Sequence, residues 1–384
     1  MFSMDLEKLL TIYENFCFSL FKDFFDYYQK ADNLNKNEKE IVNLVLSLDK
    51  KLLTNSTFIC LLFKFIQLVE KKEFEQLSNL KEEVFIELNC LLIKLKLKSS
   101  FTNTYNKKFF SREFQNTINI GEIITISNSK SLELISGVKF IQRENNPFLF
   151  ESNNNIDFAD ISKEKWIEEF SSALNFIKFE TPDIYNRIIP FLDSIGPLGF
   201  ENFHQNSLSL MFSPKVIYLS YVQDYVVQAE AIIHEVYHSI IDIFAFFDSG
   251  VKNSLDEIYY SSVQKRPRPI QNCILALHAF VAVENFYKIL LQKEILTKEE
   301  YFLRLFIIYH KNEELLLVIN KYADFTDNGL KFFEEINREH LENKIFILQL
   351  INENSKFKNL FESQKSKVLE HKEEVKNFFP NILF

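Results

Sequence analysis

Residues 226–247, VVQAEAIIHEVYHSIIDIFAFF, decide how this chain folds. The stretch contains neither Gly nor Pro, and apolar residues fill most of its positions, which predicts a buried helix. It contains His234, Glu235 and His238 in the pattern H-E-x-x-H. Because residues four apart lie on one face of a helix, the two imidazoles can bind one metal ion from the same side. Such a pattern also arises by chance in helical proteins, but here it falls in an apolar helix of a chain with seven His.

A catalytic metal site of this kind needs a third protein ligand and an open position for water or substrate. His278 is the preferred candidate because it lies in a later apolar helix that can fold back over the first. A lone His on an apolar face is often only a core residue, so two alternatives stay open. Glu257 follows at a spacing that suits a peptidase, and Asp242 lies one turn beyond His238 on the same helix. Asp248 is a weaker alternative.

The composition is that of a folded protein with room for two domains. The chain has 384 residues, of which 47% are hydrophobic and 25% charged. We expect an N-terminal helical region over residues 1–100 and a metal-binding catalytic domain with C-terminal helices over residues 101–384. The net charge of −9 argues against general nucleic-acid binding, which needs a basic surface.

The cysteines and the N-terminus predict a cytoplasmic protein. The four Cys form no C-x-x-C pair, which indicates buried thiols in a reducing compartment: Cys17, Cys60, Cys90 and Cys273. The first residues, MFSMDLEKLL, contain acidic groups where a signal peptide would be basic and then apolar. We find no continuous run of 18 apolar residues, so no membrane span is expected.

Hydrophobic periodicity predicts a mainly α fold with a small β portion, of the α+β class. A zincin-like H-E-x-x-H helix would lie beside a short sheet, with helical N- and C-terminal regions. The expected elements are four helices over residues 4–98, short strands within 101–160, a helix over 162–178, another from Pro182 to near Gly196, one or two strands within 206–220, and helices over 298–384.

Two arginines follow the polar loop after the metal helix, in the sequence KRPRPI. Arg266 and Arg268 are each followed by a proline, which restricts the backbone and limits where the guanidinium groups can point. A guanidinium held near a metal binds a carboxylate through two parallel hydrogen bonds. A loop stabilised by salt bridges is the alternative interpretation.

Three segments together resemble the HEXXH motif-domain family, which occurs in biosynthetic clusters for ribosomally made, modified peptides. These segments are Ile232–Ser239, Arg266–Ile270 and Leu277–Phe280. The segments Ala173–Pro190 and Ser207–Ser220 agree with the same pattern. The resemblance covers roughly residues 160–295, and the N-terminal helices and C-terminal tail add nothing specific to it.

The resemblance implies an Fe(II)- and 2-oxoglutarate-dependent oxygenase that hydroxylates a side-chain carbon, typically the β-carbon, of a ribosomal precursor peptide. His234, His238 and His278 would then bind iron. Arg268, or Arg266, would bind the distal carboxylate of 2-oxoglutarate, whose keto-acid end binds the metal. The protein would orient the reactants and exclude water, while iron supplies the chemistry.

Two other functions stay open. In a zinc metallopeptidase, Glu235 is the general base for a metal-bound water, and Tyr259 or Tyr260 stabilises the oxyanion. In the oxygenase, Glu235 only supports the site. In a helical scaffold protein with a structural metal, four ligands would close the site, and the sequence offers no obvious fourth.

Overall fold

The fold was analysed in a computed structural model of the chain. It describes residues 6–30, 33–48, 50, 56–94, 100–102, 109–111, 116–118, 123–125, 138–140, 161–198, 207–209, 211, 214–264, 266–380 and 382–383. The chain forms two compact units. The helical unit comprises Ser172–Phe191 and Val222–Phe384, and the mixed unit comprises Leu6–Ser171 and Leu192–Tyr221. The domain boundary expected at residue 100 adjoins residues 95–99, outside the described residues, and stays a prediction.

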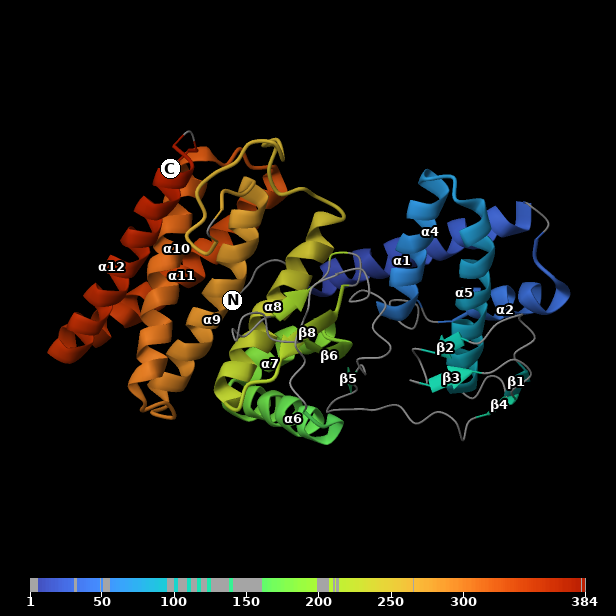
Figure 1. The fold of residues 1–384 in the computed structure, drawn as a ribbon, viewed down its shortest axis with the longest axis horizontal. Coiled ribbons are helices and arrows are strands. Elements are labelled where there is room, and N and C mark those ends of the chain that lie inside the picture. The colour runs from blue at the N-terminus through green and yellow to red at the C-terminus, as the bar shows by residue number, and fades with distance from the viewer. Residues whose placement is uncertain are drawn as a thin grey trace. The chain divides into compact units, whose positions relative to one another are not determined.

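The mixed unit begins with the helices expected from the N-terminal periodicity (Figure 1). They are α1 (Leu6–Lys30), α2 (Lys36–Leu46), α4 (Ser56–Glu70) and α5 (Phe74–Lys94). A capping box begins α2: Asn35 Oδ1 accepts the Glu38 N–H at 2.9 Å, and Glu38 Oε2 accepts the Asn35 N–H at 2.9 Å. The aromatic stripe of α1 is core, as expected, since Phe21, Phe24, Phe25 and Tyr28 are buried.

Short strands follow α5, as the β-branched residues predict. β1 (Ser100–Thr102) pairs with β4 (Ile123–Thr125), and β2 (Phe109–Ser111) pairs with β3 (Asn116–Ile118); both pairs are antiparallel. Much of the segment over residues 126–160 lies outside the described residues. Within it, strand β5 (Lys139–Phe140) confirms the strand expected around Val138 and Phe140, and the rest of the expectation stays a prediction.

A four-stranded sheet completes the mixed unit. Its order is β5 (Lys139–Phe140), β6 (Ser194–Leu198), β8 (Val216–Ser220) and β7 (Ser207–Ser209). The first three strands are parallel, and β7 runs antiparallel to β8. Every residue of β6 and β8 is buried, which explains their apolar composition. The strands expected within residues 206–220 are confirmed.

One expected boundary is wrong. Helix α7 (Pro182–Ile188) begins at its proline as predicted, but it ends well before Gly196 and continues as a short 3₁₀ turn, Ile189–Phe191. Gly196 and Pro197 lie inside strand β6 instead. Among the described residues, Pro197 pairs with Leu219 of β8 and lies beyond the two β6 residues that pair with β5.

The helical unit contains the metal helix and the C-terminal helices, which lie side by side in Figure 1. They are α8 (Tyr225–Ala245), α9 (Ile270–Gln292), α10 (Glu299–Tyr322), α11 (Asp327–Glu353) and α12 (Ser355–Phe378). Helix α9 packs against α8, α10 and α11 and is the central helix of this unit. Helix α6 (Lys163–Glu180) matches the helix expected over residues 162–178. The mainly α fold with a small β portion is therefore confirmed.

By length and composition, α9 could cross a membrane, and among the described residues it is the one helix that meets this test. In its most apolar window, 67% of the residues are buried inside the protein. The residues that α9 contributes to the core explain its hydropathy; they include Ile270, Cys273, Ile274, Leu277 and Val281.

A buried ionic network joins α9, α10 and α11. His340 on α11 lies 2.9 Å from Glu284 Oε2 through Nδ1 and 2.8 Å from Glu313 Oε1 through Nε2. Carboxylates only accept hydrogen bonds, so both ring nitrogens must donate, and the imidazole is protonated. Burial lowers the pKa of His340, but the two carboxylates outweigh it and raise the pKa to about 9. Asn312 adds a hydrogen bond of 2.8 Å to Glu284, which is fully buried.

This network makes the stability of the protein pH-dependent. Since the folded-state pKa of His340 is raised, its contribution is fully present below the unfolded value of about 6.5 and is lost as pH rises through about 9. We expect the free energy of unfolding to fall by on the order of 3 kcal/mol across this window. Denaturant unfolding at several pH values checks this. The His340→Gln variant should lose this part of the pH dependence, and an unchanged profile would contradict the assignment.

The loop between α8 and α9 is fixed on the start of α11. Asp248 Oδ1 accepts hydrogen bonds from the Gly250 N–H at 2.8 Å and from Thr326 Oγ1 at 2.7 Å. The Gly250 carbonyl in turn accepts the Thr326 N–H at 3.1 Å. A Cβ at Gly329 would lie 1.7 Å from the Gly250 oxygen, so only glycine permits this approach. The loop that continues to Arg266 and Arg268 thus begins from a defined position.

Candidate metal centre

The metal helix α8 begins at a capping residue. Asp224 Oδ1 accepts hydrogen bonds from the backbone N–H groups of Val226 at 2.9 Å and Val227 at 3.3 Å. Most residues of the helix are then buried, as the apolar sequence predicts. Its packing against α9 fixes the direction in which the histidines extend.

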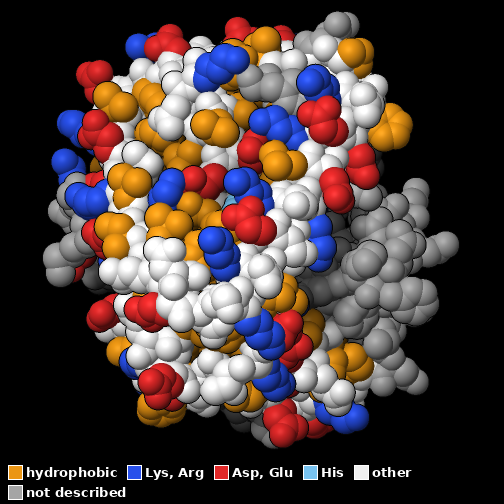
Figure 2. Space-filling view, turned by 90° about the vertical axis from the view of Figure 1, so that its left-hand side faces the viewer, with side chains coloured by type: hydrophobic (Ala, Val, Ile, Leu, Met, Phe, Trp, Pro, Cys, Tyr) orange, Lys and Arg blue, Asp and Glu red, His pale blue; other side chains and the backbone are white. Residues whose placement is uncertain are grey.

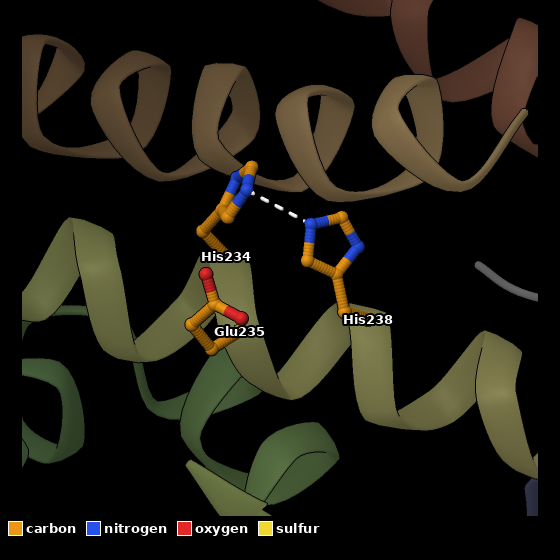
Figure 3. A group of neighbouring side chains, drawn as sticks. All are labelled: His234, Glu235 and His238. Atoms are coloured by element: carbon orange, nitrogen blue, oxygen red, sulfur yellow. Dashed lines mark hydrogen bonds between the residues drawn. The ribbon is translucent and has the colours of Figure 1, made fainter. Parts of the chain in front are cut away.

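The H-E-x-x-H side chains come together as predicted (Figure 3). His234 Nε2 and His238 Nε2 lie 3.0 Å apart, and their rings are nearly perpendicular at 81°. One ligand atom from each of His234, Glu235 and His238 lies within 4.8 Å of the others. In the part of the chain that the structure describes, no other group of three His, Cys, Asp or Glu side chains meets this condition.

Both histidines are neutral at physiological pH. Burial lowers the pKa of His234 to about 4, and the charge of Lys311 lowers it further. Burial also lowers the pKa of His238 well below its usual value, with added effects from His234, His278 and Arg268. A neutral imidazole has the lone pair that a metal requires. Both side chains remain partly exposed, so an ion can reach them.

The donor set fits a first-row metal ion. Two neutral imidazoles with a neighbouring carboxylate suit Zn(II) and Fe(II), both of which bind nitrogen and oxygen ligands. His238 Nδ1 is buried and has no hydrogen-bond partner among the described residues. Among the described residues, the hydrogen bond that this ring makes is therefore the one between its Nε2 and His234.

His278 lies close to the pair but is not part of the 4.8 Å group. It is 2% exposed on α9, and its Nδ1 lies 3.1 Å from the Tyr237 carbonyl oxygen. The carbonyl only accepts, so Nδ1 donates and Nε2 keeps its lone pair. Metal-binding histidines commonly donate their other N–H to a carbonyl in this way. Burial lowers the pKa of His278 to about 3, so the ring is neutral. Its role as third ligand stays a prediction.

The other candidate ligands lie outside the group as well. Burial, helped by the charge of Glu235, raises the pKa of Asp242 to about 7, which is unfavourable for a carboxylate ligand at neutral pH. Glu257 accepts hydrogen bonds from Tyr259 Oη at 2.6 Å and from Asn253 at 3.2 Å. Asp248 accepts hydrogen bonds from Gly250 and Thr326, which fix the loop between α8 and α9.

A two-residue bridge determines where Arg268 lies. The Tyr259 N–H donates to the Arg268 carbonyl at 2.8 Å, and the Arg268 N–H donates to the Tyr259 carbonyl at 2.9 Å. Burial, followed by repulsion from Arg266, lowers the pKa of Arg268. The charge of Arg268 also contributes to the lowered pKa of His238. Arg266 itself is exposed.

The tyrosines proposed for oxyanion stabilisation make other contacts. Tyr259 Oη donates to Glu257 at 2.6 Å, and Tyr260 Oη lies 3.2 Å from His371 Nδ1 on α12.

Two residues near His234 were not predicted as site residues. The Phe280 ring on α9 lies 4.6 Å from the His234 ring, centroid to centroid. Lys311 on α10 lies with its Nζ 5.9 Å from the centre of the Phe280 ring. The only sequence signal for Lys311 is a charge following the largely apolar segment 301–310, YFLRLFIIYH. That signal is too general to indicate a site.

No family model matches this chain, and no curated protein matches its sequence.

The geometry predicts one metal ion bound by His234 and His238. We expect the purified protein, reconstituted with Fe(II) or Zn(II), to retain about one equivalent after desalting. His234→Ala and His238→Ala should each weaken binding by more than the roughly 10- to 100-fold lost when only an orienting residue is removed. Elemental analysis measures the metal content.

His371→Gln is the matched control, since His371 lies on α12 and contacts Tyr260 instead of the pair. Equal metal content in the two alanine variants and the control would contradict the assignment.

Proposed function

We propose that this chain is an Fe(II)- and 2-oxoglutarate-dependent oxygenase that hydroxylates a side-chain carbon of a ribosomally synthesised precursor peptide. One observation carries the proposal. Two neutral imidazoles converge at 3.0 Å, and Arg268 lies in the loop that leads directly into α9, the helix that packs against theirs. The imidazoles can bind a metal ion, and the arginine can bind an anion next to that ion.

His234 and His238 would hold the iron, with His278 as the third ligand. The Nδ1–H of His278 is already bonded to the Tyr237 carbonyl, which leaves Nε2 in the tautomer that a ligand needs. Iron would supply the activation of oxygen, and 2-oxoglutarate the reducing electrons. The buried surroundings of α8 and α9 would exclude water from the reacting groups.

Arg268 supports a carboxylate co-substrate. Neither Arg266 nor Arg268 forms an ion pair with a carboxylate among the described residues, so no salt bridge of that kind stabilises the loop. The repulsion between the two guanidinium groups is relieved when an anion binds. A dicarboxylate can place one end at the metal and the other at Arg268, where two parallel hydrogen bonds would fix it.

The peptide substrate and its β-carbon are proposed from the resemblance to the HEXXH motif-domain family. A ribosomally made substrate places the reaction in the cytoplasm. Figure 2 shows basic and acidic side chains interspersed over the visible face, together with hydrophobic ones. Such a surface favours a peptide partner over nucleic acid, in keeping with the net charge of −9.

A zinc metallopeptidase is the second candidate, because the Glu235 carboxylate belongs to the 4.8 Å group. Glu235 is 3% exposed and directly follows His234 on α8 (Figure 3). This is the position that the general base for a metal-bound water takes in an H-E-x-x-H peptidase. Two arginines without a carboxylate partner have no assigned task in that mechanism. For this reason we favour the oxygenase.

Turnover of 2-oxoglutarate to succinate tests the proposal. We expect the anaerobically Fe(II)-loaded protein to form succinate when oxygen and 2-oxoglutarate are added, and faster with its peptide substrate. Glu235→Gln should lower this rate by less than the roughly 100-fold that loss of a general base costs at minimum. In a peptidase, the same substitution would remove 10²- to 10⁴-fold of the activity.

His234→Ala is the negative control, because it removes a proposed ligand. Tight stoichiometric zinc without any succinate from the iron-loaded protein would rule out the oxygenase and favour the peptidase.

A further inference from the structure

We propose that Lys311 binds the co-substrate together with Arg268, and that its ammonium group contacts the carboxylate at the keto-acid end. The inference rests on the proposed function and adds a binding residue to it. Lys311 lies on α10, a helix of the helical unit that packs against α9. Lys311 lies outside both the H-E-x-x-H segment and the R-P segment of the sequence.

A chain of contacts places Lys311 beside the metal centre. Its Nζ lies 5.9 Å from the centre of the Phe280 ring, and that ring lies 4.6 Å from the His234 ring. Lys311 is therefore connected to the pair through Phe280, which contacts His234.

The ammonium group has no carboxylate partner among the described residues. Glu230 is the acidic residue that acts on it electrostatically, but this carboxylate already accepts a hydrogen bond of 3.0 Å from Arg304 Nη1 and another from Tyr287 Oη. Burial lowers the pKa of Lys311, and Glu230 opposes the shift. A half-buried cation without a counterion is costly unless a ligand supplies the charge.

The backbone of Lys311 is tied to the loop that contains the arginines. Ser262 Oγ donates to the Lys311 carbonyl at 2.6 Å, and Ser262 is buried. The same loop continues to the Tyr259–Arg268 bridge. The backbones of Lys311 and Arg268 are thus both hydrogen-bonded to the same loop, which restricts where the two side chains can extend before a ligand binds. Such preorganisation reduces the entropy lost on binding.

Two cations on segments that pack around the pair favour a ligand with two carboxylates. Arg268, in the loop that leads into α9, would bind the distal carboxylate, and Lys311, which contacts Phe280, would bind the carboxylate that lies at the metal. An acidic side chain of the peptide substrate is the competing ligand for Lys311. The experiment separates these two ligands.

Binding of 2-oxoglutarate and 2-oxobutyrate to the Zn(II)-loaded protein tests the proposal without turnover. 2-Oxobutyrate has the keto-acid end and lacks the distal carboxylate. We expect Lys311→Met to raise the Kd of both ligands by about 10- to 100-fold, the loss typical of one charge-assisted hydrogen bond. Arg268→Met should weaken only 2-oxoglutarate. Lys311→Arg should bind more tightly than Lys311→Met, because it restores the charge.

Lys331→Met is the matched control, since Lys331 is exposed on α11. It should bind both ligands like the wild type. Equal zinc content and circular dichroism in all variants show that they are folded and loaded.

Each outcome has a distinct meaning. If the wild type binds neither ligand, the proposed function itself is overturned. If the wild type binds 2-oxoglutarate and Lys311→Met binds it equally well, the role of Lys311 is overturned while the proposed function stands. If Lys311→Met weakens only the binding of the peptide substrate, Lys311 recognises the peptide, and the proposal for it is likewise overturned.

Discussion

The helical unit depends on one constraint, the confinement of two imidazoles between α8 and α9. His234 and His238 extend from the same face of α8, and their Nε2 atoms meet at 3.0 Å. Burial keeps both rings neutral, so neither can be stabilised as a cation. The two Nε2 atoms share one hydrogen bond, and a metal ion that binds both imidazoles at once is the ligand that this spacing on a helix suits best. The cationic groups around the pair then favour an anionic ligand beside the metal.

The rest of the unit holds these groups in place. Helix α9 is central, because it packs on α8 with one side and is joined to α10 and α11 through the His340 network on another. The loop between α8 and α9 is fixed at Asp248 and again at the Tyr259–Arg268 bridge. A site built on rigid helices, with a loop fixed at several points, keeps its geometry without the ligand. This is the arrangement expected of a binding site that is formed before its ligand arrives.

Local patterns predicted much of this structure. The metal helix, the N-terminal helices and the pair β7 and β8 follow from periodicity, β-branched residues and capping, which act over a few residues. The end of α7 was wrong because Gly196 and Pro197 suggested a helix end, whereas pairing with β8 and burial stabilise a strand there. Lys311 was missed for a related reason. Its position next to Phe280, which contacts His234, arises from the packing of α9 and α10, and no spacing within the sequence encodes it.

The role of the pair can be tested most directly by anaerobic crystallography of the Fe(II)- and 2-oxoglutarate-loaded protein, with anomalous scattering at the iron edge. The account predicts one iron peak bonded to His234 Nε2 and His238 Nε2 at about 2.0–2.2 Å, with 2-oxoglutarate bound beside it. An iron peak elsewhere, or a metal closed off by four protein ligands with no position for a co-substrate, would contradict it.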